Sequence, residues 1–147
     1  MSLNPSKKII KVINFSDFYE NKIPLLQVEL ECPKIKRGKI VLGLIDTGSR
    51  YTIINKHVVE ECFSEEELKT RYFDSVIINN KKYERYSFRF TFPQLDNIGY
   101  IFNAAIIEYD PFPEELVPNV ILGREDFLRD LIVCLYKSEL ITIYKEF

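Results

Sequence analysis

The chain has 147 residues, of which 46% are hydrophobic, 14% aromatic and 29% charged. This length predicts a single domain over residues 1–147, and the composition excludes disordered, collagen-like and low-complexity classes. The formal net charge is −2, with basic residues scattered among acidic ones, so we expect no nucleic-acid partner. No apolar run approaches the roughly 20 residues that cross a bilayer, so we expect no membrane partner.

The hydrophobic pattern predicts mostly β-strands. In chain order, strands are expected at residues 9–13, 24–30, 40–45, 51–54, 76–78, 83–92, 100–108, 120–122, 131–136 and 140–144. Residues 14–22 should form a polar connection, and residues 79–82 the tip of a hairpin. The alternating aromatic stripe of residues 86, 88, 90 and 92 is expected to pack in the core.

Helical signals are few and short. Asn55 can cap a helix over residues 56–62, and Ser64 with Glu67 opens a capping box for a turn or two through Arg71. Residues 124–129 also favour a short helix. We therefore expect a compact, mostly antiparallel all-β domain with one or two short helices.

The cysteines and the single histidine bear on location and on metal binding. Cys32, Cys62 and Cys134 are odd in number, widely spaced and without a CxxC pair, which predicts reduced thiols in a cytoplasmic protein. The N-terminal residues lack the apolar block of a signal peptide. His57 is the only histidine, so neither a His/Cys zinc site nor a Ser-His-Asp triad is expected.

The most informative segment is Asp46-Thr47-Gly48-Ser49, which follows the apolar run of residues 40–45. Gly48 permits close backbone approach or positive φ, while Thr47 and Ser49 supply hydroxyl groups. The pattern predicts a largely buried Asp46 at the mouth of a strand, and a carboxylate so costly to bury is usually functional. The alternative is an Asx-type turn stabilised by its own backbone.

Two families use a turn of this kind. In the actin and sugar-kinase superfamily an Asp-x-Gly turn cradles a phosphate, but those proteins need two large domains, which 147 residues cannot hold. Asp46-Thr47-Gly48-Ser49 more closely resembles the active-site turn of aspartic proteases. A second element, Ile121-Leu122-Gly123-Arg124 followed by Asp126-Phe127-Leu128, also resembles theirs. With both elements in order, the chain resembles the single-domain, retropepsin-like (clan AA) aspartic proteases over about residues 9–145.

This resemblance implies a closed, all-β, retropepsin-like acid-protease barrel. Because the sequence holds one Asp-Thr-Gly, it also implies a homodimer in which Asp46 of each chain forms the catalytic dyad. The implied activity is that of an aspartic endopeptidase acting on peptides or proteins, with no metal and no organic cofactor. A catalytically weak or inactive module for peptide binding or dimerisation is the alternative.

The resemblance also implies roles for single residues. Thr47 would bond across the two-fold axis, Gly48 would offer backbone groups, and Ser49 would bond the outer carboxylate oxygen of Asp46. The residues expected to pack behind the turn are Ile121, Leu122, Gly123 and Arg124. The residues expected to form a flap over the substrate are Ile78, Asn79, Asn80 and Lys81.

Two positions depart from the family pattern. Many retroviral enzymes have an aspartate where this chain has Arg50, and that aspartate pairs with the arginine of the second element. We therefore expect Arg124 to pair elsewhere. The flap tip has no glycine, so either the flap moves less or it lies several residues away.

Overall fold

The computed structural model describes residues 7–18, 21–109 and 118–146. The strands are β1 (Lys7–Asn14), β2 (Ser16–Phe18), β3 (Asn21–Ile23), β4 (Leu25–Cys32), β5 (Arg37–Ile45), β6 (Thr52–Asn55), β7 (Tyr72–Ile78), β8 (Lys81–Phe92), β9 (Ile98–Ile107), β10 (Val120–Leu122), β11 (Ile132–Tyr136) and β12 (Leu140–Glu146). The helices are α1 (Lys56–Cys62), α2 (Glu65–Lys69) and α3 (Phe127–Asp130), with 3₁₀ turns at Pro33–Ile35 and Pro93–Leu95.

A closed β-barrel forms the centre of the described structure. Six strands follow one another in the order β4-β5-β10-β6-β9-β8, and a pairing of β4 with β8 joins the two ends. Strand β7 extends the sheet beyond β8 as a free edge. Strand β10 pairs parallel with β5 and antiparallel with β6, so it lies between the two strands that flank residues 46–51. The predicted closed, all-β fold is confirmed.

Aromatic side chains fill much of the barrel. Phe88, Phe90 and Phe92 are fully buried along β8, and they pack against Phe102 of β9. Tyr86 is half-buried at the edge of the same cluster. The period of two places these side chains on the inner face of β8, as the sequence predicted.

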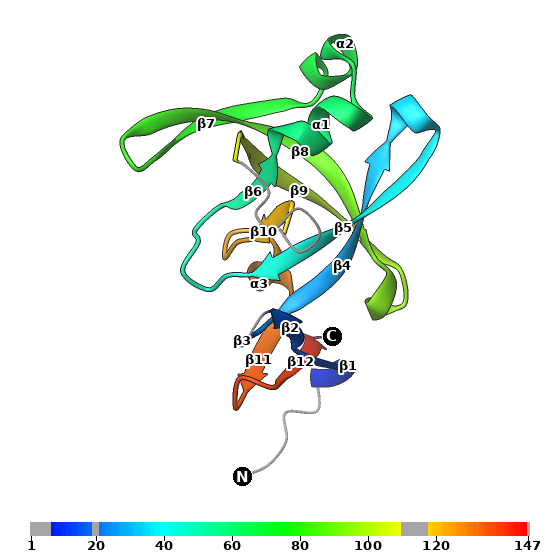
Figure 1. Cartoon of the computed structure of the whole chain (residues 1–147), viewed down its shortest axis with the longest axis vertical. Helices are drawn as coiled ribbons and strands as arrows, with labels where there is room; N and C mark the ends of the chain where they lie inside the picture. The colour runs from blue at the N-terminus through cyan, green and yellow to red at the C-terminus, as the bar shows by residue number, and fades with distance from the viewer. Residues whose placement is uncertain (1–6, 19–20, 110–117, 147) are drawn as a thin grey trace.

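The two ends of the described chain form a separate three-stranded sheet, in the order β1-β12-β11. It lies at the opposite end of the molecule from α1 and α2 (Figure 1). Residues 14–22, expected as a polar connection, include β2 and the first part of β3, and these two strands pair antiparallel. The side-chain pattern of these residues did not predict strands, whereas the hydrogen bonds that pair two strands are made by backbone groups.

The helices follow their capping signals, with one difference in number and one in position. Asn55 caps α1 by accepting from the N–H of His57, and Ser64 and Glu67 form the predicted capping box at α2. Three short α-helices are present among the described residues, where one or two were expected. The third begins at Phe127 instead of residue 124, because the backbone of Asp126 is not helical, with φ −117° and ψ −86°.

The cysteine prediction is wrong for two of the three thiols. Cys32, at the end of β4, and Cys62, at the end of α1, form a buried disulfide, while Cys134 is free and exposed. Their separation of 30 residues concealed a contact that exists only in the folded chain. The predicted cytoplasmic location was argued from unpaired thiols, and the disulfide removes that argument. No helix among the described residues is long and apolar enough to span a membrane.

Candidate active site

Asp46 stands directly beyond the last residue of β5, and its backbone is tied to β10. Ile45 pairs with Leu122, and the Asp46 N–H donates to the Leu122 carbonyl at 3.2 Å. The turn then closes on itself. The Gly48 N–H donates to Asp46 Oδ1 at 2.9 Å, and the Ser49 N–H donates to the Asp46 carbonyl at 3.2 Å. The carboxylate is thus held in an Asx-type turn whose position is set by the barrel.

The exposure of the turn differs from the prediction. Asp46 is half-buried instead of largely buried, and Thr47 and Gly48 are exposed. The reason is that β5 ends at the barrel surface, so that the turn after it faces outward from a single chain. The Ser49 hydroxyl does not bond the Asp46 carboxylate as we expected, because it donates to the Tyr51 carbonyl at 2.7 Å.

The second element lies against the turn through backbone contacts. The Gly123 N–H donates to Thr52 Oγ1 at 3.2 Å, and the Arg124 N–H donates to the Ser49 carbonyl at 2.9 Å. A Cβ at position 123 would overlap the backbone of Tyr51. Only glycine fits there. The structure therefore brings the two sequence elements together, with residues 121–124 behind the turn.

The ion pair at the end of the turn has its acid and base on the opposite segments from the family pattern. The base is on the turn, at Arg50, and the acid is on the second element, at Glu125. Arg50 donates from Nε to Glu125 Oε1 at 2.6 Å, and the Glu125 N–H donates to the Arg50 carbonyl at 3.0 Å. Arg124 is exposed and forms no ion pair with any other described residue. We expected Arg124 to form an ion pair with another residue. Instead, the ion pair at this point joins Arg50 to Glu125. Both side chains are substantially exposed, at 63% and 38%, so this pair contributes little stability.

An apolar row runs across the outer face of the sheet beside Asp46. Ile121 pairs with Leu44 on one side and with Ile53 on the other. All three are half-buried, while their chain neighbours Val120, Leu122 and Ile54 point into the barrel core. Strand alternation therefore directs this row away from the core. Its half-buried side chains offer an apolar surface next to a carboxylate.

The predicted flap residues lie at the tip of the β7–β8 hairpin. Asn79 and Asn80 form a two-residue turn in which both have positive φ, 51° and 66°. Asparagine tolerates this conformation better than other non-glycine residues, which explains a tip without glycine. The strands are longer than expected, since β7 begins at Tyr72. In Figure 1 this hairpin and the loop between β5 and β6 project on the same side of the barrel.

A buried acid stands behind the turn that the sequence analysis did not identify as a site residue. Asp126 is 9% exposed, and its Oδ1 accepts from the Asn103 N–H at 3.2 Å. Burial raises the pKa of Asp126, and bonding to Thr52 and Asn103 lowers that pKa only in part. Sequence spacing gave no signal for this burial, because the neighbouring Glu125 is equally acidic and lies at the surface rim.

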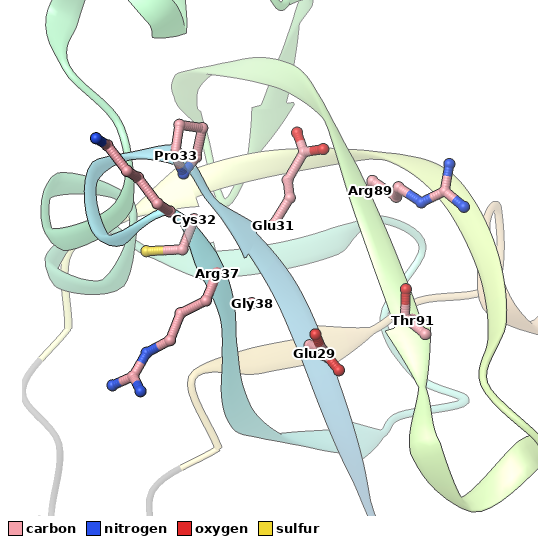
Figure 2. Close-up of a pocket in the computed structure, with 9 residues that line it drawn as sticks. Glu29, Glu31, Cys32, Pro33, Arg37, Gly38, Arg89 and Thr91 are labelled. Atoms are coloured by element: carbon pink, nitrogen blue, oxygen red, sulfur yellow. The ribbon is translucent and has the colours of Figure 1, made fainter.

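The histidine and a hollow beside the disulfide lie outside the Asp46 turn. His57 is half-exposed, with Nε2 3.9 Å from Glu108. Among the described residues no group of three or more His, Cys, Asp or Glu side chains is placed to hold a metal ion. A hollow of about 320 Å³ lies at the far end of β5 from Asp46, beside the disulfide (Figure 2). Its lining mixes Glu29 and Glu31 with Arg37 and Arg89.

Comparisons with known proteins agree with this geometry at the level of the fold. Neither a scan against protein-family models nor a search of curated proteins matched the sequence. Among solved structures, a retropepsin-like aspartic protease from Rickettsia conorii matches with a TM-score of 0.61 at 10% identity, over 98% of each chain. The retroviral protease-like domain of Ddi1 from Leishmania major matches with a TM-score of 0.50 at 15% identity, over 79% of this chain and 82% of that chain. The chain has the retropepsin-like fold.

Proposed function

We propose that the protein is a homodimeric aspartic endopeptidase in which Asp46 of each chain contributes one carboxylate. The observation that carries this proposal is the backbone junction of the two sequence elements. Asp46 is bonded to Leu122 at one end of the turn, and Ser49 to Arg124 at the other. This junction fixes a half-buried carboxylate beside the apolar row of Leu44, Ile121 and Ile53.

A second copy is needed because the chemistry requires two carboxylates and the sequence has one Asp-Thr-Gly. Thr47 and Gly48 are exposed in a single chain, so they are accessible for contact with a second copy. A hollow of about 490 Å³ beside Thr47 is lined by apolar side chains and by two arginines: Leu128, Leu131, Ile132, Val133, Arg124 and Arg129. A two-fold axis through the turn would cover these apolar groups and bring both Asp46 side chains together.

The dyad would work by sharing one proton. Two carboxylates about 3 Å apart repel by about 5 kcal/mol at an effective dielectric constant near 20, so one stays protonated at mildly acidic pH. The ionised carboxylate takes a proton from water as the water oxygen bonds to the peptide carbonyl carbon. The protonated carboxyl gives its proton to the carbonyl oxygen. The resulting gem-diol breaks its C–N bond as the nitrogen receives the proton that the first carboxyl took from water. At the same time one gem-diol hydroxyl returns a proton to the second carboxylate, which restores the singly protonated dyad.

The remaining residues would hold this arrangement together. We assign Thr47 to a bond across the axis and Gly48 to backbone contacts with the dyad and substrate. Residues 78–81 of the β7–β8 hairpin would close over the substrate and exclude water. The apolar row would receive hydrophobic substrate side chains.

The test compares the wild type with Asp46→Asn on a denatured peptide mixture from about pH 3 to pH 7, a range that spans carboxylate titration. Fragments are identified by mass spectrometry, and both proteins are first shown to be folded dimers by light scattering. We expect cleavage by the wild type alone, strongest at acidic pH. Equal cleavage by both proteins would exclude Asp46 as the catalyst. No cleavage by either dimer would leave a peptide-binding module as the better description.

A further inference from the structure

A cluster of stacked arginine and aromatic side chains joins the Asp46 loop to the β7–β8 hairpin. The guanidinium of Arg85 on β8 lies 5.0 Å from the ring centroid of Tyr51 and 5.1 Å from that of Phe73 on β7. Arg50 lies 5.0 Å from the same Tyr51 ring. We call these four residues the arginine–aromatic stack. Within it, Arg85 is the member that touches both the loop and the hairpin.

Two carboxylates fix Arg85 within this stack. Arg85 Nε and Nη2 donate to the two carboxylate oxygens of Asp74, each at 2.7 Å. Nη1 lies 3.8 Å from Glu125 Oε2, in the segment just after Gly123. The guanidinium holds the pKa of Asp74 below its ordinary value. The Arg85 side chain is only 11% exposed, while its partners Asp74 and Glu125 are 40% and 38% exposed, so the two-bond geometry with Asp74 is what fixes the guanidinium.

The position of Arg85 places it at the end of the apolar row. Arg85 pairs with Ala105, Ala105 pairs with Ile53, and Ile53 pairs with Ile121. Cross-strand partners share one face of a sheet, so Arg85 continues the face that carries Ile121 and Ile53. It therefore stands where the base of the hairpin meets the outer end of the apolar row.

We infer that Arg85 is a positioning residue that holds the base of the flap hairpin against the Asp46 loop, and that this contact sets substrate affinity. The inference rests on the proposed function for its role toward substrate. A planar guanidinium can stack on Tyr51 while its edge binds Asp74 through two parallel bonds. A lysine at this position keeps the positive charge, but it has no planar group to stack on Tyr51 and cannot make two parallel hydrogen bonds to Asp74.

The test uses Arg85→Lys with Arg89→Lys as the matched control. Arg89 lies on the same strand and the same sheet face, but it is exposed and outside the stack. For Arg85→Lys we expect KM for a cleaved peptide to rise about fivefold with kcat changed less than about twofold. Arg89→Lys should leave both constants unchanged. A loss of folded protein alone would lower the apparent kcat and leave KM unaltered.

Hydrogen–deuterium exchange of the substrate-free protein gives a readout independent of activity. Arg85→Lys should speed exchange in residues 50–52 and 72–84 about threefold or more, and Arg89→Lys should not. Phe73→Leu removes one layer of the stack at a half-exposed site, so it serves if Arg85→Lys does not fold. It should shift KM and exchange in the same direction.

Two results would overturn the inference. One is unchanged exchange in the loop and hairpin of both variants. The other is faster exchange with an unchanged KM, which would make Arg85 a structural residue only. If the wild type cleaves nothing, the proposed function fails, while the exchange data still decide whether Arg85 couples the hairpin to the loop.

Discussion

The Asp46 loop and the β7–β8 hairpin are held in place by different kinds of interaction. The loop is fixed by backbone hydrogen bonds to β10 and to the residues after it, and by a glycine that allows the two backbones to touch. Between loop and hairpin, the contacts come from the side chains of the arginine–aromatic stack. The comparison teaches that one half of the candidate site is defined by backbone geometry, and the other half by the identity of a few side chains.

The largest loss of stability should come from a substitution at Gly123, which disrupts the backbone contacts of the Asp46 loop. Gly123→Ala places a methyl group against the Tyr51 backbone, which cannot move without displacing the turn. We expect a loss of about 4 kcal/mol or more in the free energy of unfolding, measured by urea denaturation. Gly48→Ala is the control, since its Cβ meets only Asp46 Oδ1 at 3.2 Å and should cost less than about 1 kcal/mol. Equal losses would contradict the assigned backbone contact.

A somewhat smaller effect is expected from the disulfide, which closes a loop that contains the Asp46 turn but not the hairpin. With Cys32 and Cys62 separated by 30 positions, removing the cross-link should cost about 3–4 kcal/mol. Cys62→Ser tests this by thermal unfolding, with Cys134→Ser as the control on an exposed free thiol. A thiol titration should find one reactive group in the unfolded wild type. Three would show that the bond is absent.

The smallest effect concerns Asp126, which lies between the two halves. Burial raises its pKa above the ordinary value of 3.8, so the folded state holds the proton more tightly than the unfolded chain. The stability from this group is present below about pH 3.8 and is lost as pH rises toward the folded pKa. Asp126→Asn removes that slope. Its stability relative to the wild type should rise over this window, by less than about 2 kcal/mol, and then level off. A difference that does not vary with pH would contradict the raised pKa.

The sequence predicted the parts of the fold that rest on local patterns. The alternation of residues 86–92, the capping box at Ser64 and the glycine at position 123 each have a local physical cause, and each lies where it was expected. The two elements around Asp46 and Leu122 were also predicted to meet. Their apolar approach and their order along the chain carried enough information for that.

What the sequence could not show depends on distance along the chain. The disulfide joins residues 30 positions apart, and the Arg50–Glu125 ion pair joins residues 75 positions apart. Arg85 stands in an alternating strand at a position that otherwise reads as solvent-facing. It becomes buried only because the Asp46 loop and the hairpin base converge on it. The exposure of Asp46 was predicted wrongly, because the sequence does not show where the end of β5 lies relative to the barrel surface.

The insertion of β10 between β5 and β6 also has a consequence for the order of folding. Residues 37–55 supply the two flanking strands and the turn, yet they do not pair with each other, and the strand that joins them begins at residue 120. Such non-local pairing makes closure a late event, because the long intervening chain must first be ordered. The carboxylate turn is therefore assembled only when the barrel is complete. A partly folded or growing chain that lacks residues 120–125 carries Asp46 but lacks the backbone contacts from Leu122 and Arg124 that hold its turn.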